Sequence, residues 1–418
     1  MKAYLISIGD ELLIGQTINT NASFIAEKLT DLNISVIKIS VIGDDAESIT
    51  KEIAEAEKNA NVIIITGGLG PTHDDVTLKT IADYFNTELI LNKDVLNDIS
   101  DFFRKRGREL NKINENQALV PKIAKPIRNR KGTAPGSWIE RNNKIFISMP
   151  GVPQEMKGMM DDFVIPKLLE IIESKSKVIL KKTLLTTGIP ESNLFLALGD
   201  LDEILEGAKL ALLPNQLGVK MRLTVTSDSK EEAEEKLFII EQRIRLKVGR
   251  YIYGKENETL EEVVGRLLSE RGLTIATAES CTGGLIASRL TNISGSSKYF
   301  QRGFVTYSNG AKVENLKVNE DTIQKCGAVS IEVVRQMAEG VKAVSGTDIG
   351  IAVTGILGPT GGTAEKPVGL VYIGLCDDKI CTAKKYMFGD DRLLNKDRVS
   401  QAALEMLRRY LLGINLED

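Results

Sequence analysis

Short apolar runs rich in β-branched residues alternate with amphipathic helical segments over residues 1–173, and no other sequence feature constrains the fold as strongly. Strand–helix alternation of this kind predicts a mostly parallel sheet that is covered by helices on both faces. A hairpin that turns at Asn142-Asn143 and a final helix over 154–173 complete the region. The expected strands span 4–8, 35–42, 62–66 and the hairpin 138–149, and the expected helices span 21–32 and 45–58.

Polar or charged segments at 174–177 and 255–258 divide the chain, whose 418 residues exceed the usual size of one domain. We therefore expect an α/β domain over 1–173, a small α+β domain over 174–254 and an α/β domain over 255–418. The third domain opens with a T-x-x-E capping box and alternates strands with helices again. Its expected strands span 273–278, 304–307, 349–354 and 370–375, and its last helix spans 396–412.

Composition excludes several classes of protein. The net charge of −3 gives no field that would draw the molecule to nucleic acid or to a membrane. The N-terminal segment lacks the pattern of a signal peptide and no apolar stretch is long enough for a membrane span, so we expect a cytoplasmic protein. The four cysteines form no C-x-x-C pair and are expected to be reduced thiols. The single histidine, His73, excludes sites that need two.

Two glycine-rich loops follow predicted strands of the N-terminal domain, at the edge where open α/β sheets bind ligands. The first spans 9–15 and leads to Asn19 and Asn21 at a helix start, and the second spans 67–77. Glycines such as Gly67, Gly68 and Gly70 let the backbone approach a phosphate, and carboxylates beside a phosphate indicate a bridging divalent metal.

Other interpretations of these loops stay open. A glycine-rich turn after a strand can be only a tight turn, and Asp74 and Asp75 can serve only as helix caps. Two such loops at one sheet edge favour the ligand site over these alternatives.

In the C-terminal domain, Ser280 lies at a predicted strand-to-helix turn that continues into Gly283 and Gly284. Free backbone amides at such a turn can stabilise an oxyanion, which suits a nucleophile. No histidine is near in sequence, so Lys312 is the best candidate for its base, because a desolvated lysine can be neutral. A third loop also follows a strand and can cradle a phosphate or bind an amide group; it runs from Thr354 and contains Gly355, Gly358, Gly361 and Gly362.

These residues also have structural interpretations. Ser280 can simply cap the helix, Lys312 can be a solvated surface residue, and Tyr307 can be an ordinary strand aromatic. Cys281 is expected to be a buried small hydrophobic residue and not a nucleophile. Three loops at successive strand ends favour the functional interpretation.

The N-terminal motifs resemble the molybdopterin-binding-like domain of the CinA family. The resemblance rests on the Gly9-Asp10-Glu11 loop, the Gly-Gly-Leu-Gly-Pro-Thr-x-Asp-Asp loop and the Met-Pro-Gly-Val-Pro segment at 149–153. It implies a metal-dependent ADP-ribose pyrophosphatase, acting on ADP-ribose or a similar nucleotide pyrophosphate with Mg²⁺, Mn²⁺ or Co²⁺. The carboxylates it implies for metal and phosphate handling are Asp10, Glu11, Asp74 and Asp75.

The C-terminal motifs resemble the nicotinamide-nucleotide amidase domain of the same family over about 259–412, from Ala-Glu-Ser-Cys-Thr-Gly-Gly to Lys-Pro-Val-Gly. The resemblance implies conversion of nicotinamide mononucleotide to nicotinic acid mononucleotide and ammonia, with no cofactor. Ser280 would be the nucleophile, Lys312 its base, and Tyr307 and Thr354 would orient or polarise the substrate. The family's Gly-Asp-Arg motif is altered here, which leaves Arg392 and Arg398 as alternative phosphate ligands.

The middle segment is similar in position to the KH-like domain of full-length CinA proteins. Its turn at 188–191 lacks the second glycine of a nucleic-acid-binding G-x-x-G loop. Residues 174–250 contain 13 basic and 11 acidic side chains, so the segment has no strong positive charge. We therefore expect a spacer or dimerisation role in a homodimer, and binding to nucleic acid is disfavoured. Three alternatives stay open for the whole chain: a non-catalytic nucleotide sensor, a competence-related nucleic-acid-associated protein, or an enzyme in which one of the two sites is active.

Overall fold

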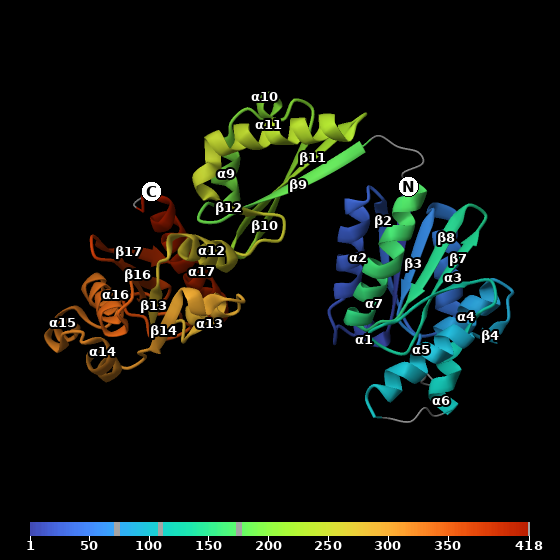
Figure 1. Cartoon of the computed structure of the whole chain (residues 1–418), viewed down its shortest axis with the longest axis horizontal. Helices are drawn as coiled ribbons and strands as arrows, with labels where there is room; N and C mark the ends of the chain where they lie inside the picture. The colour runs from blue at the N-terminus through green and yellow to red at the C-terminus, as the bar shows by residue number, and fades with distance from the viewer. Residues whose placement is uncertain (71–75, 108–111, 173–177, 417–418) are drawn as a thin grey trace. The chain divides into compact units, whose positions relative to one another are not determined.

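The computed structural model describes residues 1–70, 76–107, 112–172 and 178–416. The chain forms two compact units, Met1–Ser176 and Lys177–Asp418 (Figure 1). The second unit contains both the middle and the C-terminal domain. No helix within the described ranges is long and apolar enough to cross a membrane.

The N-terminal unit is built on a six-stranded sheet of order β2-β1-β3-β8-β7-β6, in which β2, β1, β3 and β8 are parallel and β7 is antiparallel to both of its neighbours, β8 and β6. Asn142 and Asn143 both have positive φ, 52° and 59°, and make the turn between β7 and β8. The strands are β1 (Lys2–Ile8), β2 (Ser35–Ile42), β3 (Val62–Thr66), β6 (Lys125–Ile127), β7 (Gly136–Arg141) and β8 (Lys144–Met149), with β4 (Leu89–Leu91) and β5 (Leu119–Pro121) paired separately.

Helices cover both faces of this sheet. Alternate residues of β1 point to opposite faces, so they pack against different helices. Ala3 and Leu5 pack with α2 and α7, whereas Tyr4 and Ile6 pack with α3 and α4. The expected mostly parallel, doubly covered sheet is confirmed. The helices are α1 (Asp10–Leu13), α2 (Thr20–Asp31), α3 (Ala46–Asn59), α4 (Thr77–Tyr84), α5 (Lys93–Arg104), α6 (Lys112–Glu115), a 3₁₀ turn (Asn116–Ala118), α7 (Pro153–Met159), a π-helical segment (Met160–Val164) and α8 (Ile165–Ile172).

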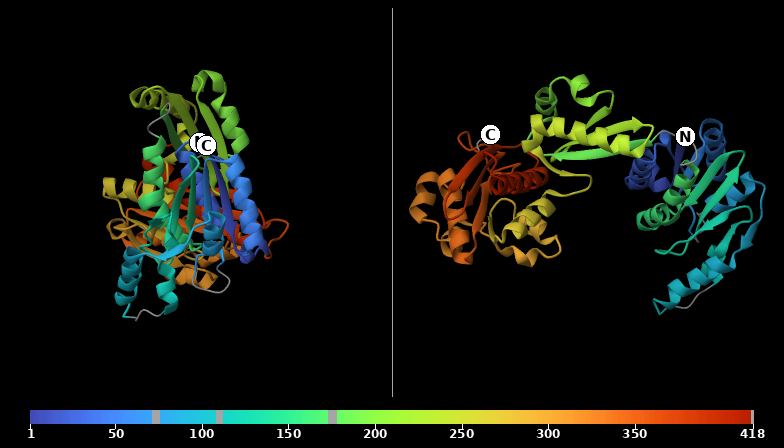
Figure 2. Two further views of the ribbon diagram at one scale, coloured as in Figure 1. Left: turned by 90° about the vertical axis from the view of Figure 1, so that its right-hand side faces the viewer. Right: turned by 45° about the horizontal axis from the view of Figure 1, so that its top comes forward.

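The middle domain is a four-stranded antiparallel sheet of order β10-β11-β9-β12 with helices on one face. Its longest helix, α11, lies along the sheet (Figures 1 and 2), and Ile240 and Ile244 of α11 belong to one core with Met221 of β11. The elements are β9 (Val178–Thr186), α9 (Glu191–Leu198), α10 (Leu201–Leu205), β10 (Lys209–Asn215), β11 (Gly218–Ser227), α11 (Lys230–Val248), a 3₁₀ turn (Gly249–Tyr251) and β12 (Ile252–Lys255).

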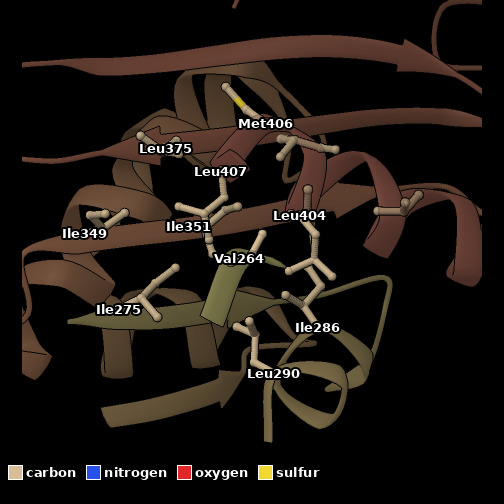
Figure 3. Packing of buried hydrophobic residues seen from close by; sticks show 14 of the residues in the cluster. Val264, Ile275, Ile286, Leu290, Ile349, Ile351, Leu375, Leu404, Met406 and Leu407 are labelled. Atoms are coloured by element: carbon tan, nitrogen blue, oxygen red, sulfur yellow. The ribbon is translucent and has the colours of Figure 1, made fainter. Parts of the chain in front are cut away.

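The C-terminal domain has a five-stranded sheet of order β14-β13-β15-β16-β17, in which β14, β13 and β15 are parallel. Ile275 and Ile351 pack with Val264 and Leu404 on one face (Figure 3), and Ala276 packs with α16 on the other. The elements are α12 (Leu260–Arg271), β13 (Ile275–Glu279), α13 (Leu285–Thr291), a 3₁₀ turn (Ser296–Lys298), β14 (Phe300–Val305), α14 (Asn309–Leu316), α15 (Glu320–Cys326), α16 (Ile331–Ser345), β15 (Ile349–Gly355), β16 (Leu370–Cys376), β17 (Cys381–Met387) and α17 (Arg392–Leu412).

The expectation of four free thiols is wrong for one pair, because Cys376 and Cys381 form a disulfide. The two residues lie opposite each other in the register of β16 and β17, with their Cα atoms 4.1 Å apart. Sequence spacing alone did not show this, since β17 was not predicted as a strand. Cys281 and Cys326 are free.

Helix α17 joins the middle and C-terminal domains through buried polar side chains. Arg408, only 1% exposed, donates to the backbone carbonyls of Arg250 at 2.6 Å and Ile252 at 3.4 Å, and to the Glu405 carboxylate. Gln401 donates from Nε2 to Thr187 Oγ1 at 3.2 Å. Thr187 is the residue directly before the turn at 188–191, so this KH-like turn lies against the C-terminal domain.

Candidate functional site

Ser280 and Lys312 lie together at the edge of the C-terminal sheet. Ser280 follows β13, and Lys312 projects from α14, with its Nζ 3.2 Å from Ser280 Oγ. Lys312 is 1% exposed, and its Nζ also donates to the carbonyls of Thr306 at 2.8 Å and Tyr307 at 3.3 Å. The expected pairing of the two side chains is present, and Lys312 is not a solvated surface residue.

Electrostatics favour the serine over the neighbouring cysteine as the nucleophile. Burial lowers the pKa of Lys312 from its usual value, so the amine loses its proton more readily than an exposed lysine does. Burial raises the pKa of the Cys281 thiol to about 12, so the reactive thiolate is scarce at neutral pH. Cys281 is 6% exposed and packs in the hydrophobic core, as the sequence predicts.

A buried carboxylate, Glu279, shapes the turn that carries Ser280. Glu279 is 1% exposed and accepts hydrogen bonds from Thr282 Oγ1 at 2.6 Å and from three backbone amides, those of Gly284, Ile286 and Ala287, at 2.8–3.1 Å. It therefore caps α13 from the preceding strand, a role that Ser280 does not take. Sequence analysis missed Glu279, although an acid at the end of an apolar strand was a visible signal.

The turn leaves two backbone amides available beside Ser280. Within the described residues no backbone carbonyl accepts from the amides of Cys281 and Thr282, which lie against the Cys281 sulfur, a weak acceptor. Gly283 and Gly284 have positive φ, 63° and 96°, so a side chain at either position would be strained. The turn is therefore suited to binding an oxyanion close to the Ser280 hydroxyl.

Arg392, the first residue of α17, belongs to the surroundings of this site. Its Nη2 donates to Tyr307 Oη at 3.1 Å and its Nη1 to the Gly358 carbonyl at 3.1 Å. Tyr307 is 63% exposed, so the Arg392–Tyr307 pair stands at the surface. Lys396, one helical turn further along, lies with its Nζ 3.7 Å from the point where a Cβ on Gly283 would be. Sequence analysis did not single out Lys396.

Arg398 lies elsewhere. It lines a cavity of about 450 Å³ between the middle and C-terminal domains, together with Thr187, Tyr386 and Gln401. The structure thus brings Arg392, and not Arg398, to the residues around Ser280.

Thr354 and the glycines of the third loop support the backbone. Thr354 is 1% exposed and donates from Oγ1 to the Ala328 carbonyl at 2.9 Å. A Cβ on Gly355 or Gly358 would lie 2.6 Å from a valine side chain, and a Cβ on Gly362 would lie 2.7 Å from the Val368 amide. Close packing of the protein thus requires these glycines, whereas Gly361, with φ 92°, faces no atom closer than 3.7 Å.

The N-terminal loops surround a separate cavity of about 530 Å³. Gly67, Gly68, Gly70 and Glu11 line it, as the sequence predicts. Gly67 has φ 109°, and a Cβ there would clash with the Ile8 carbonyl, because β1 and β3 end side by side.

Asn19 and Asn21 hold these loops in place. Asn19 accepts from the Ala22 amide at 3.1 Å and donates to Ser7 Oγ at 2.9 Å, so it caps α2 and ties it to β1. Asn21 donates from Nδ2 to the Gly151 carbonyl at 2.6 Å. Neither asparagine is among the residues that line the cavity.

Only part of the predicted metal site can be placed. Asp10 and Glu11 begin α1, and the Asp10 amide donates to Asp44 Oδ2 at 3.1 Å, whereas Asp74 and Asp75 lie outside the described residues. Within the described ranges, no group of three or more His, Cys, Asp or Glu side chains could hold a metal. Glu11 and Asp44 both line the cavity, and Mg²⁺ bound to phosphates needs only one or two carboxylates. The residues present therefore fit a phosphate-bridged Mg²⁺.

Four polar residues that line the cavity were not predicted from the sequence: Asp44, Gln117, Thr133 and Glu155. Glu155 resembles an ordinary acid in the first turn of α7, but it lies two residues after the Met-Pro-Gly-Val-Pro segment that marks this domain. Gln117 lies in a short 3₁₀ turn and carried no sequence signal.

Three family models match successive parts of the chain: the probable molybdopterin binding domain over residues 4–170, the damage-inducible protein CinA KH domain over 181–254, and the CinA C-terminal domain over 257–411. A CinA-like protein from Kosmotoga olearia is 43% identical over 414 residues, which are 99% of this chain and 100% of that relative. The chain belongs to the CinA family. A second CinA-like protein, from Chloroherpeton thalassium, is 44% identical over 98% of this chain and 99% of its own length.

Solved structures similar to this CinA-family chain cover a part of it. The competence/damage inducible protein CihA from Agrobacterium tumefaciens is 43% identical over 36% of this chain and 94% of that protein, with a TM-score of 0.35. A competence-damaged protein (CinA) superfamily protein from Klebsiella pneumoniae is 31% identical over 37% of this chain and 99% of its own, with a TM-score of 0.36. The order of the three matched domains is the one expected from the sequence motifs.

Proposed function

We propose that the C-terminal domain of this CinA-family protein hydrolyses the carboxamide of nicotinamide mononucleotide, with Ser280 as nucleophile. The observation that carries the proposal is the 3.2 Å contact between Ser280 Oγ and the buried Lys312 Nζ. A serine needs a base, and a desolvated lysine is one of the few side chains that can supply it without histidine.

The proposed reaction proceeds through one covalent acyl-enzyme intermediate. Neutral Lys312 takes the hydroxyl proton as Ser280 Oγ bonds to the carboxamide carbon, and the amides of Cys281 and Thr282 stabilise the oxyanion. Lys312 then gives the proton to the leaving nitrogen, the carbon–nitrogen bond breaks and ammonia departs. Water attacks the ester carbon, a second proton passes through Lys312 to Ser280 Oγ, and nicotinic acid mononucleotide leaves.

The substrate phosphate is proposed to bind near Arg392, at the start of α17. Arg392 holds the exposed Tyr307 hydroxyl, and Lys396 adds a second positive charge beside the Ser280 turn. A guanidinium is suited to phosphate because it can donate two parallel hydrogen bonds.

In the N-terminal domain, we propose metal-dependent cleavage of a nucleotide pyrophosphate such as ADP-ribose. Support comes from the cavity in which glycine loops and the carboxylates Glu11 and Asp44 meet. When bound, a divalent cation would neutralise phosphate charge and activate water. Glu11 and Asp44 would hold it, while the Gly68 amide would bind a phosphate oxygen, since the Gly67 amide already donates to the Met149 carbonyl at 3.1 Å.

Nucleic-acid binding by the middle domain is not proposed. The Thr187 hydroxyl directly before the KH-like turn accepts from Gln401 of the C-terminal domain, and the turn lacks the second glycine of a G-x-x-G clamp.

Replacement of Ser280 by Ala should abolish ammonia release from nicotinamide mononucleotide, because the nucleophile is lost while a small buried side chain remains. Cys281→Ala is the matched control and should retain most of the activity. A coupled assay of ammonia measures both. A wild type that binds the nucleotide without releasing ammonia would instead support a non-catalytic sensor.

The kcat/KM of the amidase should rise with pH and level off above the lowered pKa of Lys312, because only the neutral amine can accept the serine proton. The inflection should fall below the ordinary lysine value of about 10.4. Lys312→Arg should be inactive at every pH, since its guanidinium stays protonated. Rates measured between about pH 6 and pH 10 test this; a profile that falls across the range would contradict the assignment.

Arg392→Ala should raise KM for nicotinamide mononucleotide by about ten- to a hundredfold with a smaller change in kcat, since a charge-assisted contact to phosphate contributes about 1.5–3 kcal/mol. Arg398→Ala, which changes the cavity between the domains, should leave KM near its wild-type value. Steady-state kinetics of both variants check the prediction. The reverse pattern would place the phosphate on Arg398.

ADP-ribose should yield AMP and ribose 5-phosphate in the presence of Mg²⁺, Mn²⁺ or Co²⁺, and EDTA should stop the reaction because the pyrophosphate charge is then not neutralised. Chromatography of the products measures the turnover. Ser280→Ala serves as the control and should cleave ADP-ribose at the wild-type rate. Turnover that persists in EDTA would contradict the metal dependence.

A further inference from the structure

The N-terminal cavity has a second kind of lining besides its glycine loops and the carboxylates Glu11 and Asp44. Gln117 and Glu155 contribute side chains to the same cavity from the 3₁₀ turn Asn116–Ala118 and from α7. The phosphate and metal chemistry proposed for this domain uses neither of them.

Gln117 is 8% exposed, and its Oε1 is buried without any hydrogen-bond donor in the described structure. A buried carbonyl oxygen that lacks a donor costs free energy, so such atoms in folded proteins usually meet water or a ligand. An amide side chain can both accept from and donate to a hydroxyl group. Because Gln117 lines the cavity, this unmet acceptor lies beside a space that a donor-bearing ligand can occupy.

In the described structure, the hydrogen bond that holds the Glu155 side chain goes to one of its two carboxylate oxygens. Asn129 donates from Nδ2 to Glu155 Oε2 at 2.7 Å, and Asn129 Oδ1 accepts from the amides of Lys131 at 3.0 Å and Gly132 at 2.8 Å. A Cβ on Gly132 would clash with the Glu155 carboxylate, so the loop packs closely around it. Among the described residues Glu155 has no ion-pair partner, and burial raises its pKa.

The two acceptors restrict the chemistry of what they bind. A carboxylate repels phosphate, so the part of the ligand that lies at Glu155 must be uncharged and rich in donors. The vicinal hydroxyls of a ribose meet this requirement, and a carboxylate that accepts from ribose hydroxyls is a recurrent arrangement in nucleotide sites.

We propose that Gln117 and Glu155 form a sugar subsite, which accepts hydrogen bonds from the hydroxyls of a ribose whose phosphate lies against the glycine loops. This inference deepens the proposed pyrophosphatase function and rests on the same cavity. It assigns selectivity for a ribose phosphate over a bare phosphate to Gln117 and Glu155, with Asn129 as the residue that positions the carboxylate.

The test measures binding and needs no turnover. Isothermal titration in the presence of Mg²⁺ compares ribose 5-phosphate with inorganic phosphate on the full-length wild type, Gln117→Leu, Glu155→Gln and the control Glu27→Gln, an exposed glutamate on α2. The wild type and the control should prefer ribose 5-phosphate by about tenfold or more, which one or two such hydrogen bonds can supply. Each cavity variant should lose about tenfold for ribose 5-phosphate and keep its affinity for phosphate.

In the binding assay, three outcomes overturn the subsite: a wild type without the preference, variants that keep it, or variants that lose both ligands equally, as loss of a metal ligand would produce. Gln117→Leu removes an unpartnered polar atom and keeps the side-chain volume, so it provides a folded variant even if Glu155→Gln misfolds. The pyrophosphatase proposal can fail separately. In that case the protein would bind ribose 5-phosphate selectively but would not cleave ADP-ribose. If Glu155→Gln loses kcat on ADP-ribose but keeps KM, Glu155 is a general base and the subsite is refuted.

Discussion

Parallel strands deliver the loops that follow them to one edge of a sheet, and both proposed sites depend on this constraint. In the N-terminal unit, β1 and β3 end side by side, so Gly67 approaches the Ile8 carbonyl too closely for any side chain. In the C-terminal domain, β13 pairs with both β14 and β15, which brings Ser280 into reach of Lys312, just beyond β14. The chemistry differs, but the geometry that gathers the residues is the same.

Buried polar groups fix the geometry of the proposed amidase site, which flexible loops alone would not hold in place. Glu279 meets four donors in the turn after β13, and Lys312 donates to two carbonyls in the segment after β14. Glu279 therefore positions the turn that carries Ser280, and Lys312 positions the segment that carries Tyr307. An active-site serine needs such support, because small displacements of a nucleophile cost large factors in rate.

Much of this structure could be predicted from the sequence, and the exceptions have physical causes. Strands 35–42 and 62–66 were placed to the residue because apolar runs end at clear turn signals. Strand β17 was missed since Lys384 and Lys385 interrupt its apolar pattern, and its disulfide was missed with it. Ser280 and Lys312 were predicted from motifs, and Glu279 carried a signal as an acid at the end of an apolar strand, whereas Gln117 and Glu155 act through contacts that no sequence spacing reveals. The predicted ligands Asp74 and Asp75 lie outside the described residues.

Helix α17 has two partners along its length. Its first turn carries Arg392 beside Tyr307, and its last turns carry Arg408, whose guanidinium is buried against carbonyls of the middle domain. The C-terminal domain is therefore not a portable module in this chain, because separation from the middle domain would remove the Arg250 and Ile252 carbonyls and leave Arg408, of these acceptors, with the Glu405 carboxylate alone. Evolutionary exchange of this domain between proteins would have to carry the β9–β12 sheet along or redesign the second half of the helix.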